Sequence, residues 1–171
     1  WGVGGVRRPI IMLPGRLTFW KGQDVFIDAL ISIKELDFLA LCVGAAEDHS
    51  SFVRKLHEKI EAHGLEEKIK LVGHCDDMPA ALSLADLVVS ASSTQPEAFG
   101  KVAIEAMAMA KPIIATKHGG SLETVIDGET GLLVPPADPQ KLAEAISQLL
   151  ASSASPAAFA ASARSSAPAL V

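Results

Sequence analysis

Short apolar runs recur along this chain, and each is closed by glycine, proline or small polar residues. Runs of this kind are typical of strands that are buried on both faces of a sheet. The first run ends at Pro14 and Gly15, the second at Gly44 and the third at Gly73. The pattern predicts six strands, at residues 9–13, 38–43, 69–72, 86–90, 112–115 and 131–134.

The segments between these runs carry apolar residues three and four positions apart, the spacing of one helix face. Gly64 stands where a helix C-cap belongs, and Asp138 is a suitable N-cap for the last helix. The segment at 101–110 is apolar almost all round, so we expect a buried helix there. The helices are predicted at residues 24–36, 52–63, 79–84, 101–110 and 139–150, with a short one after Gly119 and Gly120.

Strands that alternate with helices predict an α/β fold, in which a parallel sheet of about six strands carries helices on both faces. We expect this Rossmann-like domain to cover residues 9–150 of the 171. Residues 1–8 are glycine-rich and unpatterned, which indicates a linker or an expression remnant. Residues 151–171 consist mostly of Ala, Ser and Pro and predict a low-complexity tail.

The charge balance narrows the choice of partner. The formal net charge is −5, with 20 acidic against 15 basic residues, so a nucleic-acid partner is not expected. The two cysteines, Cys42 and Cys75, belong to no CxxC or His/Cys cluster, and we expect no metal site. With neither a basic leader nor a long apolar run, the chain reads as cytoplasmic, with or without peripheral attachment to the inner face of a membrane.

Two loops that follow predicted strands contain unusual residues. After the first strand, Arg16 and Lys21 precede a helix that begins near residue 23. Two cations and a helix N-terminus are suited to neutralising a diphosphate. The alternative is that both are ordinary solvated loop charges.

After the fourth strand comes Glu97, and Glu105 is the one acid in the apolar helix that follows. Burying a carboxylate without a partner is costly, so Glu105 needs one, and a ribose diol offers two hydroxyl donors. The alternative is that Glu105 pairs with an arginine inside the fold and that Glu97 is a loop acid.

The segment from Pro96 to Ala115, PEAFGKVAIEAMAMAKPIIA, contains Glu97 and Glu105 as a Glu-x7-Glu pair. It resembles the signature of the retaining glycosyltransferases of family 4, in the C-terminal domain of their two-domain GT-B fold. The loop 15–22, the segment 119–134 and the segment 138–143 match further motifs of that family in the same order. The resemblance covers about residues 9–150.

The resemblance implies a donor-binding half of an enzyme that transfers a sugar, with retention, from a nucleotide-diphosphate sugar, without cofactor or metal. Arg16 and Lys21 would bind the diphosphate, Glu97 the sugar and Glu105 the ribose, with Glu97, Arg16 and Lys21 as the catalytic set. The base would lie near residues 72–75. The remaining substrate-binding positions would be Gly15, Gly44, His74 and, through main-chain amides, Phe99, Gly100 and Lys101.

The N-terminal, acceptor-binding domain of the family is missing from this sequence, so the isolated chain is expected to be inactive. The acceptor is left open between a lipid and a polysaccharide. Ala110 stands where the family usually has glycine, and Gly44 is followed by Ala45 instead of a second glycine. A non-catalytic sugar-nucleotide-binding or scaffold domain of the same fold is the alternative function, although such a domain would be expected to lose part of the Arg, Lys and Glu set.

Overall fold

The computed structural model describes residue 5, residues 7–46 and residues 51–151. Six strands form one parallel sheet in the order β3-β2-β1-β4-β5-β6. The predicted α/β class and the number of strands are confirmed. The predicted tail at 151–171 lies, apart from its first residue, outside the described residues, as does most of the predicted linker at 1–8. The strands are β1 (Ile10–Pro14), β2 (Leu39–Val43), β3 (Ile69–Gly73), β4 (Leu87–Ser90), β5 (Ile113–Thr116) and β6 (Gly131–Val134).

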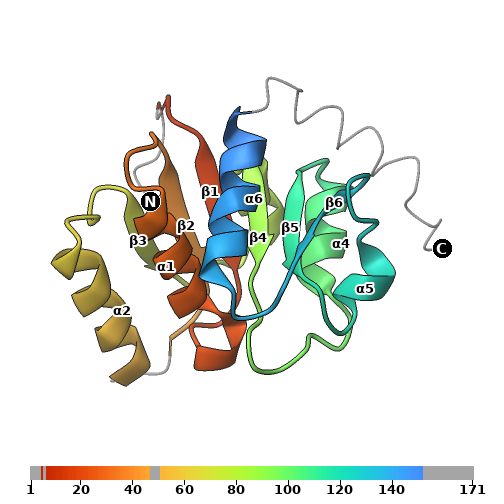
Figure 1. Ribbon diagram of the computed structural model, residues 1–171, viewed down its shortest axis with the longest axis horizontal. Helices are drawn as coiled ribbons and strands as arrows, with labels where there is room; N and C mark the ends of the chain where they lie inside the picture. The colour runs from red at the N-terminus through yellow and green to blue at the C-terminus, as the bar shows by residue number, and fades with distance from the viewer. Residues whose placement is uncertain (1–4, 6, 47–50, 152–171) are drawn as a thin grey trace.

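Helices cover both faces of the sheet (Figure 1). Successive side chains of a strand point to opposite faces, so Ile11 and Leu13 pack in one half of the core while Ile10 and Met12 pack in the other. The first half lies under α1 (Gln23–Ser32), α2 (Ser51–Ala62) and α6 (Pro139–Ala151), and the second under α3 (Met78–Leu84) and α4 (Lys101–Ala108). The remaining helices are α5 (Ser121–Thr124) and the 3-10 turn η1 (Phe19–Lys21).

The order of the crossings explains this distribution. The connections β1-α1-β2 and β2-α2-β3 build the sheet outward in one direction, and the chain then returns through α3 to place β4 on the other side of β1. Helix α6 closes the fold by packing against α1. Within the described residues, no helix combines the length and the apolar character needed to span a membrane.

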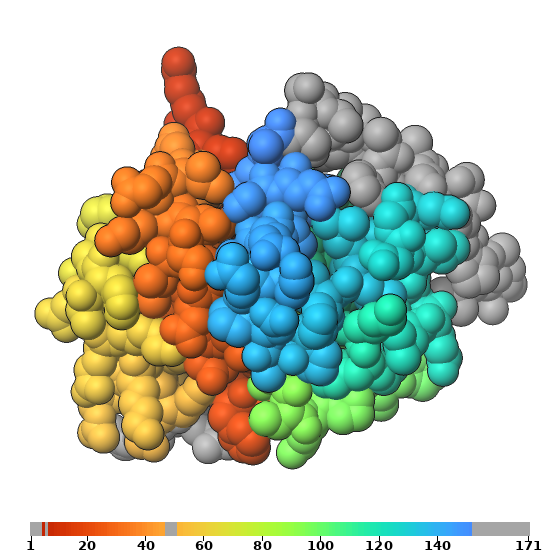
Figure 2. All heavy atoms as spheres, in the orientation of Figure 1, coloured from red at the N-terminus to blue at the C-terminus, as the bar shows by residue number. Residues whose placement is uncertain are grey.

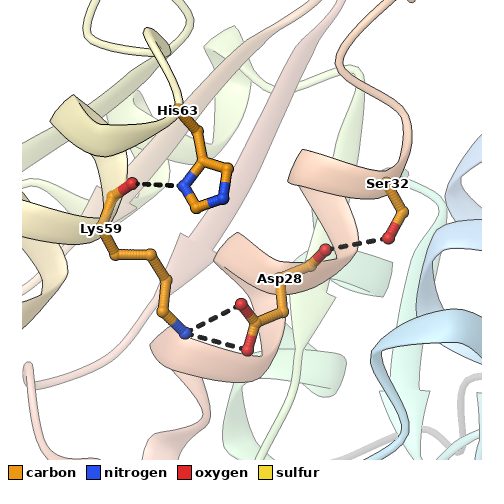
Figure 3. A network of polar contacts seen from close by, with 4 residues as sticks. All are labelled: Asp28, Ser32, Lys59 and His63. Carbon is orange, nitrogen blue, oxygen red and sulfur yellow. Dashed lines mark hydrogen bonds and ion pairs between the residues drawn. The ribbon is translucent and has the colours of Figure 1, made fainter.

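Helix α2 is joined to α1 by a small polar network on the outside of the molecule (Figure 3). The ammonium of Lys59 donates to both carboxylate oxygens of Asp28, at 2.8 and 2.9 Å, and His63 Nδ1 donates to the carbonyl of Lys59. The Asp28 side chain is 44% exposed, and a pair of this kind contributes about 0–1 kcal/mol. Burial of Leu56 and Ile60 therefore holds α2 more than the ion pair does.

Two predictions about helices are wrong. Helix α1 ends at Ser32 instead of residue 36. Beyond Ser32 the amides bond to carbonyls three residues back, as in a 3-10 turn, and the Leu36 amide donates to the Ile33 carbonyl in this way. Helix α4 is buried only at Ala103 and Ala106, because only one of its faces lies on the sheet. The Glu105 side chain is accordingly 35% exposed, so burial does not force it to find a partner.

Candidate functional site

Strands β2 and β3 follow β1 on one side of the sheet, and β4, β5 and β6 lie on its other side, so the strand order changes direction between β1 and β4. In an open parallel sheet, ligands bind beyond the carboxyl ends of the strands at such a switch point, because the loops on its two sides lead to opposite faces and leave a crevice. The loops after β1 and after β4 meet at this position, along the lower edge in Figure 1. These two loops contain Arg16, Lys21 and Glu97, so the sequence-predicted residues gather at one end of the sheet.

Hydrogen bonds join the two loops. The Ser93 amide donates to the carbonyl of Trp20 at 2.9 Å, and the Ser93 hydroxyl donates to the carbonyl of Phe19 at 3.3 Å. Gly22, with a φ of 77°, lies so close to the Ala91 carbonyl that a Cβ at this position would come within 1.8 Å of the oxygen. Only glycine fits there. Figure 2 shows atoms of the two loops side by side at the lower edge of the molecule.

The contact between Lys21 and Glu97 is the central feature of the site. The Lys21 ammonium donates to Glu97 Oε1, which also accepts a hydrogen bond from the Ser92 hydroxyl at 3.1 Å. The side chains of Lys21 and Glu97 are only 15% and 16% exposed, and the ammonium lies 4.4 Å from the centre of the Trp20 ring. Charges that lie 76 residues apart in the sequence therefore form one shielded pair.

Arg16 belongs to the same loop as Lys21. Its side chain is exposed, and among the described residues its guanidinium has no ion-pair or hydrogen-bond partner. The Arg16 carbonyl accepts from the side-chain amide of the fully buried Gln23, which fixes the backbone of the loop. A cation anchored through its backbone and free at its head group is suited to receiving an anionic ligand.

Gly15 and Gly44 line the base of the same loop. The Gly15 amide donates to the carbonyl of Val43, and a Cβ on Gly15 would touch the methylene stem of Lys21. A Cβ on Gly44 would come within 2.0 Å of the Gly15 carbonyl oxygen. The close backbone approach at Gly44 is thus present within the protein itself, although Ala45 follows it.

Two uncapped helix N-termini open onto this edge. Gly22 precedes α1 and Gly100 precedes α4, and no side chain caps either helix. Amides at the start of a helix lack partners within the helix and carry partial positive charge. Phe99 is 79% exposed and the Lys101 side chain 83% exposed, whereas Gly100 between them is buried.

The loop after β5 supports the loop that contains Glu97. The Gly120 amide donates to the carbonyl of Glu97 at 2.7 Å. Gly119 and Gly120 lie directly against residues 96–100, so this glycine pair sets the path of the chain into α4. The backbone position of Glu97 is therefore fixed from both neighbouring loops.

Two further sequence-predicted residues do not join the pair. Glu105 makes an ion pair with Lys101 on the surface of α4, at 3.4 Å, and not with an arginine inside the fold. His74 is exposed after β3, where its ring contacts Asp76 at 3.0 Å. The Gly44 amide donates to the Gly73 carbonyl, which places the His74 loop beside the loop after β2.

Two residues of the site were not identified from the sequence. Ser92, which is 1% exposed, and Gln23 are buried polar residues that bond to the two loops. For Trp20 the sequence left two roles open, covering the site or shielding the sheet, and its ring lies against the Lys21 ammonium. A serine directly after a buried strand and a glutamine at a helix start are weak signals on their own. Their roles depend on the meeting of β1 and β4, which the order of residues does not show.

Elsewhere in the described chain, we find no second group of side chains suited to catalysis or to metal binding. Burial raises the pKa of Cys42 to about 12, so this thiol is not a nucleophile near neutral pH. No three His, Cys, Asp or Glu side chains gather as metal ligands within residues 7–46 and 51–151. A hollow of about 480 Å³ between the ends of α1 and α6 lies at the amino ends of the strands, away from the charged loops.

Comparison with known proteins agrees with this geometry. The profile of the family described as "Glycosyl transferases group 1" matches residues 5–166. The chain is 33% identical over 146 residues to the mannosylfructose-phosphate synthase of Agrobacterium fabrum, covering 81% of this chain and 32% of that protein. The chain spans about a third of the length of the curated relatives it matches.

Solved structures show the same fold. The Anabaena protein HepE, in complex with UDP and glucose, superposes with a TM-score of 0.88 at 35% identity, covering 95% of this chain and 44% of that one. The C-terminal domain of the group 1 protein LpcC from Francisella tularensis superposes with a TM-score of 0.82 at 31% identity, covering 92% and 83%. The chain belongs to the group 1 glycosyl transferases and corresponds to the C-terminal domain of their GT-B fold.

Proposed function

We propose that this chain binds the nucleotide-diphosphate sugar of a glycosyl transfer that proceeds with retention at the sugar. The observation that carries the proposal is the meeting of Lys21 and Glu97 at the switch point, with the unpaired Arg16 in the same loop as Lys21. A diphosphate requires concentrated positive charge and a sugar requires hydrogen-bond acceptors. This edge of the sheet offers both within one pair of loops.

The diphosphate would lie against Arg16 and Lys21. The uncapped N-termini of α1 and α4 point their amides toward the same edge, which adds partial positive charge. The amides of Phe99, Gly100 and Lys101 would receive phosphate or sugar oxygens. This arrangement supplies the positive field without a metal ion.

The two carboxylates would bind different parts of the donor. Glu97 would accept hydrogen bonds from hydroxyls of the sugar, and Glu105 from the two ribose hydroxyls. The 35% exposure of Glu105 and its loose ion pair with Lys101 leave its carboxylate accessible to a ligand. The base would lie over the loops that contain Gly44 and His74, and backbone groups of residues 72–75 would contact it.

The proposed chemistry is a substitution on one face of the sugar. The acceptor oxygen attacks the anomeric carbon while the bond from that carbon to the phosphate oxygen breaks, and the acceptor proton passes to the departing phosphate. Negative charge grows on the phosphate as the bond breaks, so Arg16 and Lys21 stabilise the transition state more than the bound donor. Glu97 orients the sugar, which is why it belongs to the catalytic set.

The acceptor would bind to a part of the protein beyond these residues. Phe19 and Phe99, 57% and 79% exposed, flank the site and offer apolar surface that a second domain would cover. We therefore expect transfer to require that domain, whether the acceptor is a lipid or a polysaccharide. The non-catalytic alternative is less favoured, because Arg16, Lys21, Glu97 and Glu105 are all present.

Calorimetry with UDP, GDP, ADP and their glucose or mannose derivatives, in excess EDTA, tests the proposal. We expect at least one nucleoside diphosphate to bind, and Arg16→Gln to weaken its binding about tenfold because a charge-assisted contact is lost. Arg7→Gln is the matched control, since Arg7 is an exposed arginine just before β1, at the amino end of the sheet. Loss of all binding on chelation, or equal effects of the two substitutions, would contradict the proposal.

A further inference from the structure

Glu97 forms an ion pair with Lys21, one of the two cations proposed to bind the diphosphate. The Lys21 ammonium donates to Glu97 Oε1, the Trp20 ring shields it, and both charged side chains are about five-sixths buried. Ser92 donates to the same carboxylate oxygen, so Glu97 is held in place from a second side. Much of the charge of Lys21 is therefore already balanced by a residue of the chain.

The Lys21–Glu97 pair weakens the binding of a nucleoside diphosphate that carries no sugar. Its phosphates compete with Glu97 for the Lys21 ammonium, and they bring negative charge close to a carboxylate that is shielded from water. If Lys21 turns toward the phosphate, Glu97 loses its charged partner. If Lys21 stays, the ammonium is shared and attracts the phosphate less. Both arrangements weaken binding of the nucleotide.

A nucleotide that still carries its sugar is not weakened in this way. The sugar hydroxyls donate hydrogen bonds to Glu97 and replace the contact with Lys21, which frees the ammonium for the phosphate. One carboxylate thus opposes the nucleoside diphosphate and favours the same nucleotide with a sugar attached. The backbone on both sides of the exchange is held, since Ser93 bonds to the carbonyls of Phe19 and Trp20 and the Gly120 amide donates to the carbonyl of Glu97.

We propose that Glu97 makes the site discriminate between the sugar-bearing donor and the nucleoside diphosphate released by transfer, by competing with the released diphosphate for Lys21. This inference rests on the proposed function and assigns Glu97 a second role in it. The consequence is that the product nucleotide leaves the site more readily than the geometry of Arg16 and Lys21 alone would allow.

The test measures the affinity of the intact chain for UDP, GDP and ADP by calorimetry at low ionic strength. Glu97→Gln keeps the size of the side chain and removes its charge, so we expect the nucleoside diphosphate to bind about tenfold more tightly than to the wild type. A gain in affinity distinguishes this role from a structural one, because damage to the loop would weaken binding. Glu97→Ala removes the same charge and replaces the amide variant if that variant fails to fold.

Glu129→Gln is the matched control, because Glu129 is an exposed acid just before β6, at the opposite end of the sheet. The affinity of Glu129→Gln for each nucleoside diphosphate should equal that of the wild type. Unchanged or weaker binding by Glu97→Gln overturns the inference and leaves the proposed function standing, and so does equal tightening by Glu129→Gln. Failure of UDP, GDP and ADP to bind both the wild type and Glu97→Gln overturns the proposed function and the inference with it.

Discussion

Glu97 and Glu105 belong to one sequence motif but lie in different surroundings. Glu97 is shielded and bonded to Lys21 and Ser92, whereas Glu105 is 35% exposed on α4 and pairs with Lys101, whose side chain is 83% exposed. An exposed pair of this kind adds little to stability. Any strong effect of changing Glu105 should therefore come from a ligand and not from folding.

Replacing Glu105 by Gln should lower nucleotide affinity while leaving the melting temperature nearly unchanged. A carboxylate that accepts from both ribose hydroxyls makes charge-assisted contacts of roughly 1.5–3 kcal/mol, so the affinity should fall about tenfold or more. Calorimetry and a thermal melt of the same samples measure the two quantities. Glu144→Gln is the control, since Glu144 is also an exposed helix acid paired with a lysine, Lys141. Equal, small changes in affinity for both variants would contradict the ribose assignment.

At the scale of the element, the end of α4 is strained at Ala110, the residue that stands where the family usually has glycine. The Lys111 amide donates to the Ala106 carbonyl and the Ala110 amide to the Met107 carbonyl, which is the hydrogen-bond pattern of a Schellman motif. In this motif the residue just after the helix end adopts the left-handed conformation. Ala110 holds this position and has a φ of 55°. An alanine in that conformation is strained, because its Cβ crowds the following carbonyl.

Ala110→Gly should raise the free energy of unfolding by about 0.5–1 kcal/mol, since glycine adopts this conformation without strain. Urea denaturation of the variant and the wild type measures the difference. Ala108→Gly lies in the last turn of α4 itself, where the same substitution should lower stability by roughly 0.5–1 kcal/mol. A loss of stability at both positions would contradict the account of the helix end.

The elements were predictable from the sequence where the physical signal is local. Buried parallel strands are nearly continuous apolar runs, so β2 and β4 were located to within a residue or so of their ends. The turn η1 has three residues and no periodicity, and it was missed. The pairing of Lys21 with Glu97 was missed for another reason: it depends on β4 lying beside β1, and no local pattern specifies the order of strands.

At the scale of the whole molecule, strand order determines where chemistry can occur. Strand order changes direction between β1 and β4, and nine of the ten sequence-predicted positions lie in the loops and the helix start beyond the carboxyl ends of β1 to β4, with Glu105 further along α4. The amino ends carry the hollow between α1 and α6, which has no comparable set of charges. We therefore expect a nucleoside diphosphate to bind at one edge of the sheet, beyond the carboxyl ends of the strands.

Titration of the isotope-labelled chain with UDP and with GDP, followed through its amide resonances by NMR, shows at which edge the nucleotide binds. The amides that shift should belong to residues 15–22, to Gly44, to residues 72–75 and to residues 99–101, while the amides of Glu129 and Leu36 should not shift. Shifts concentrated around the hollow between α1 and α6, or spread evenly over both ends of the sheet, would contradict this expectation.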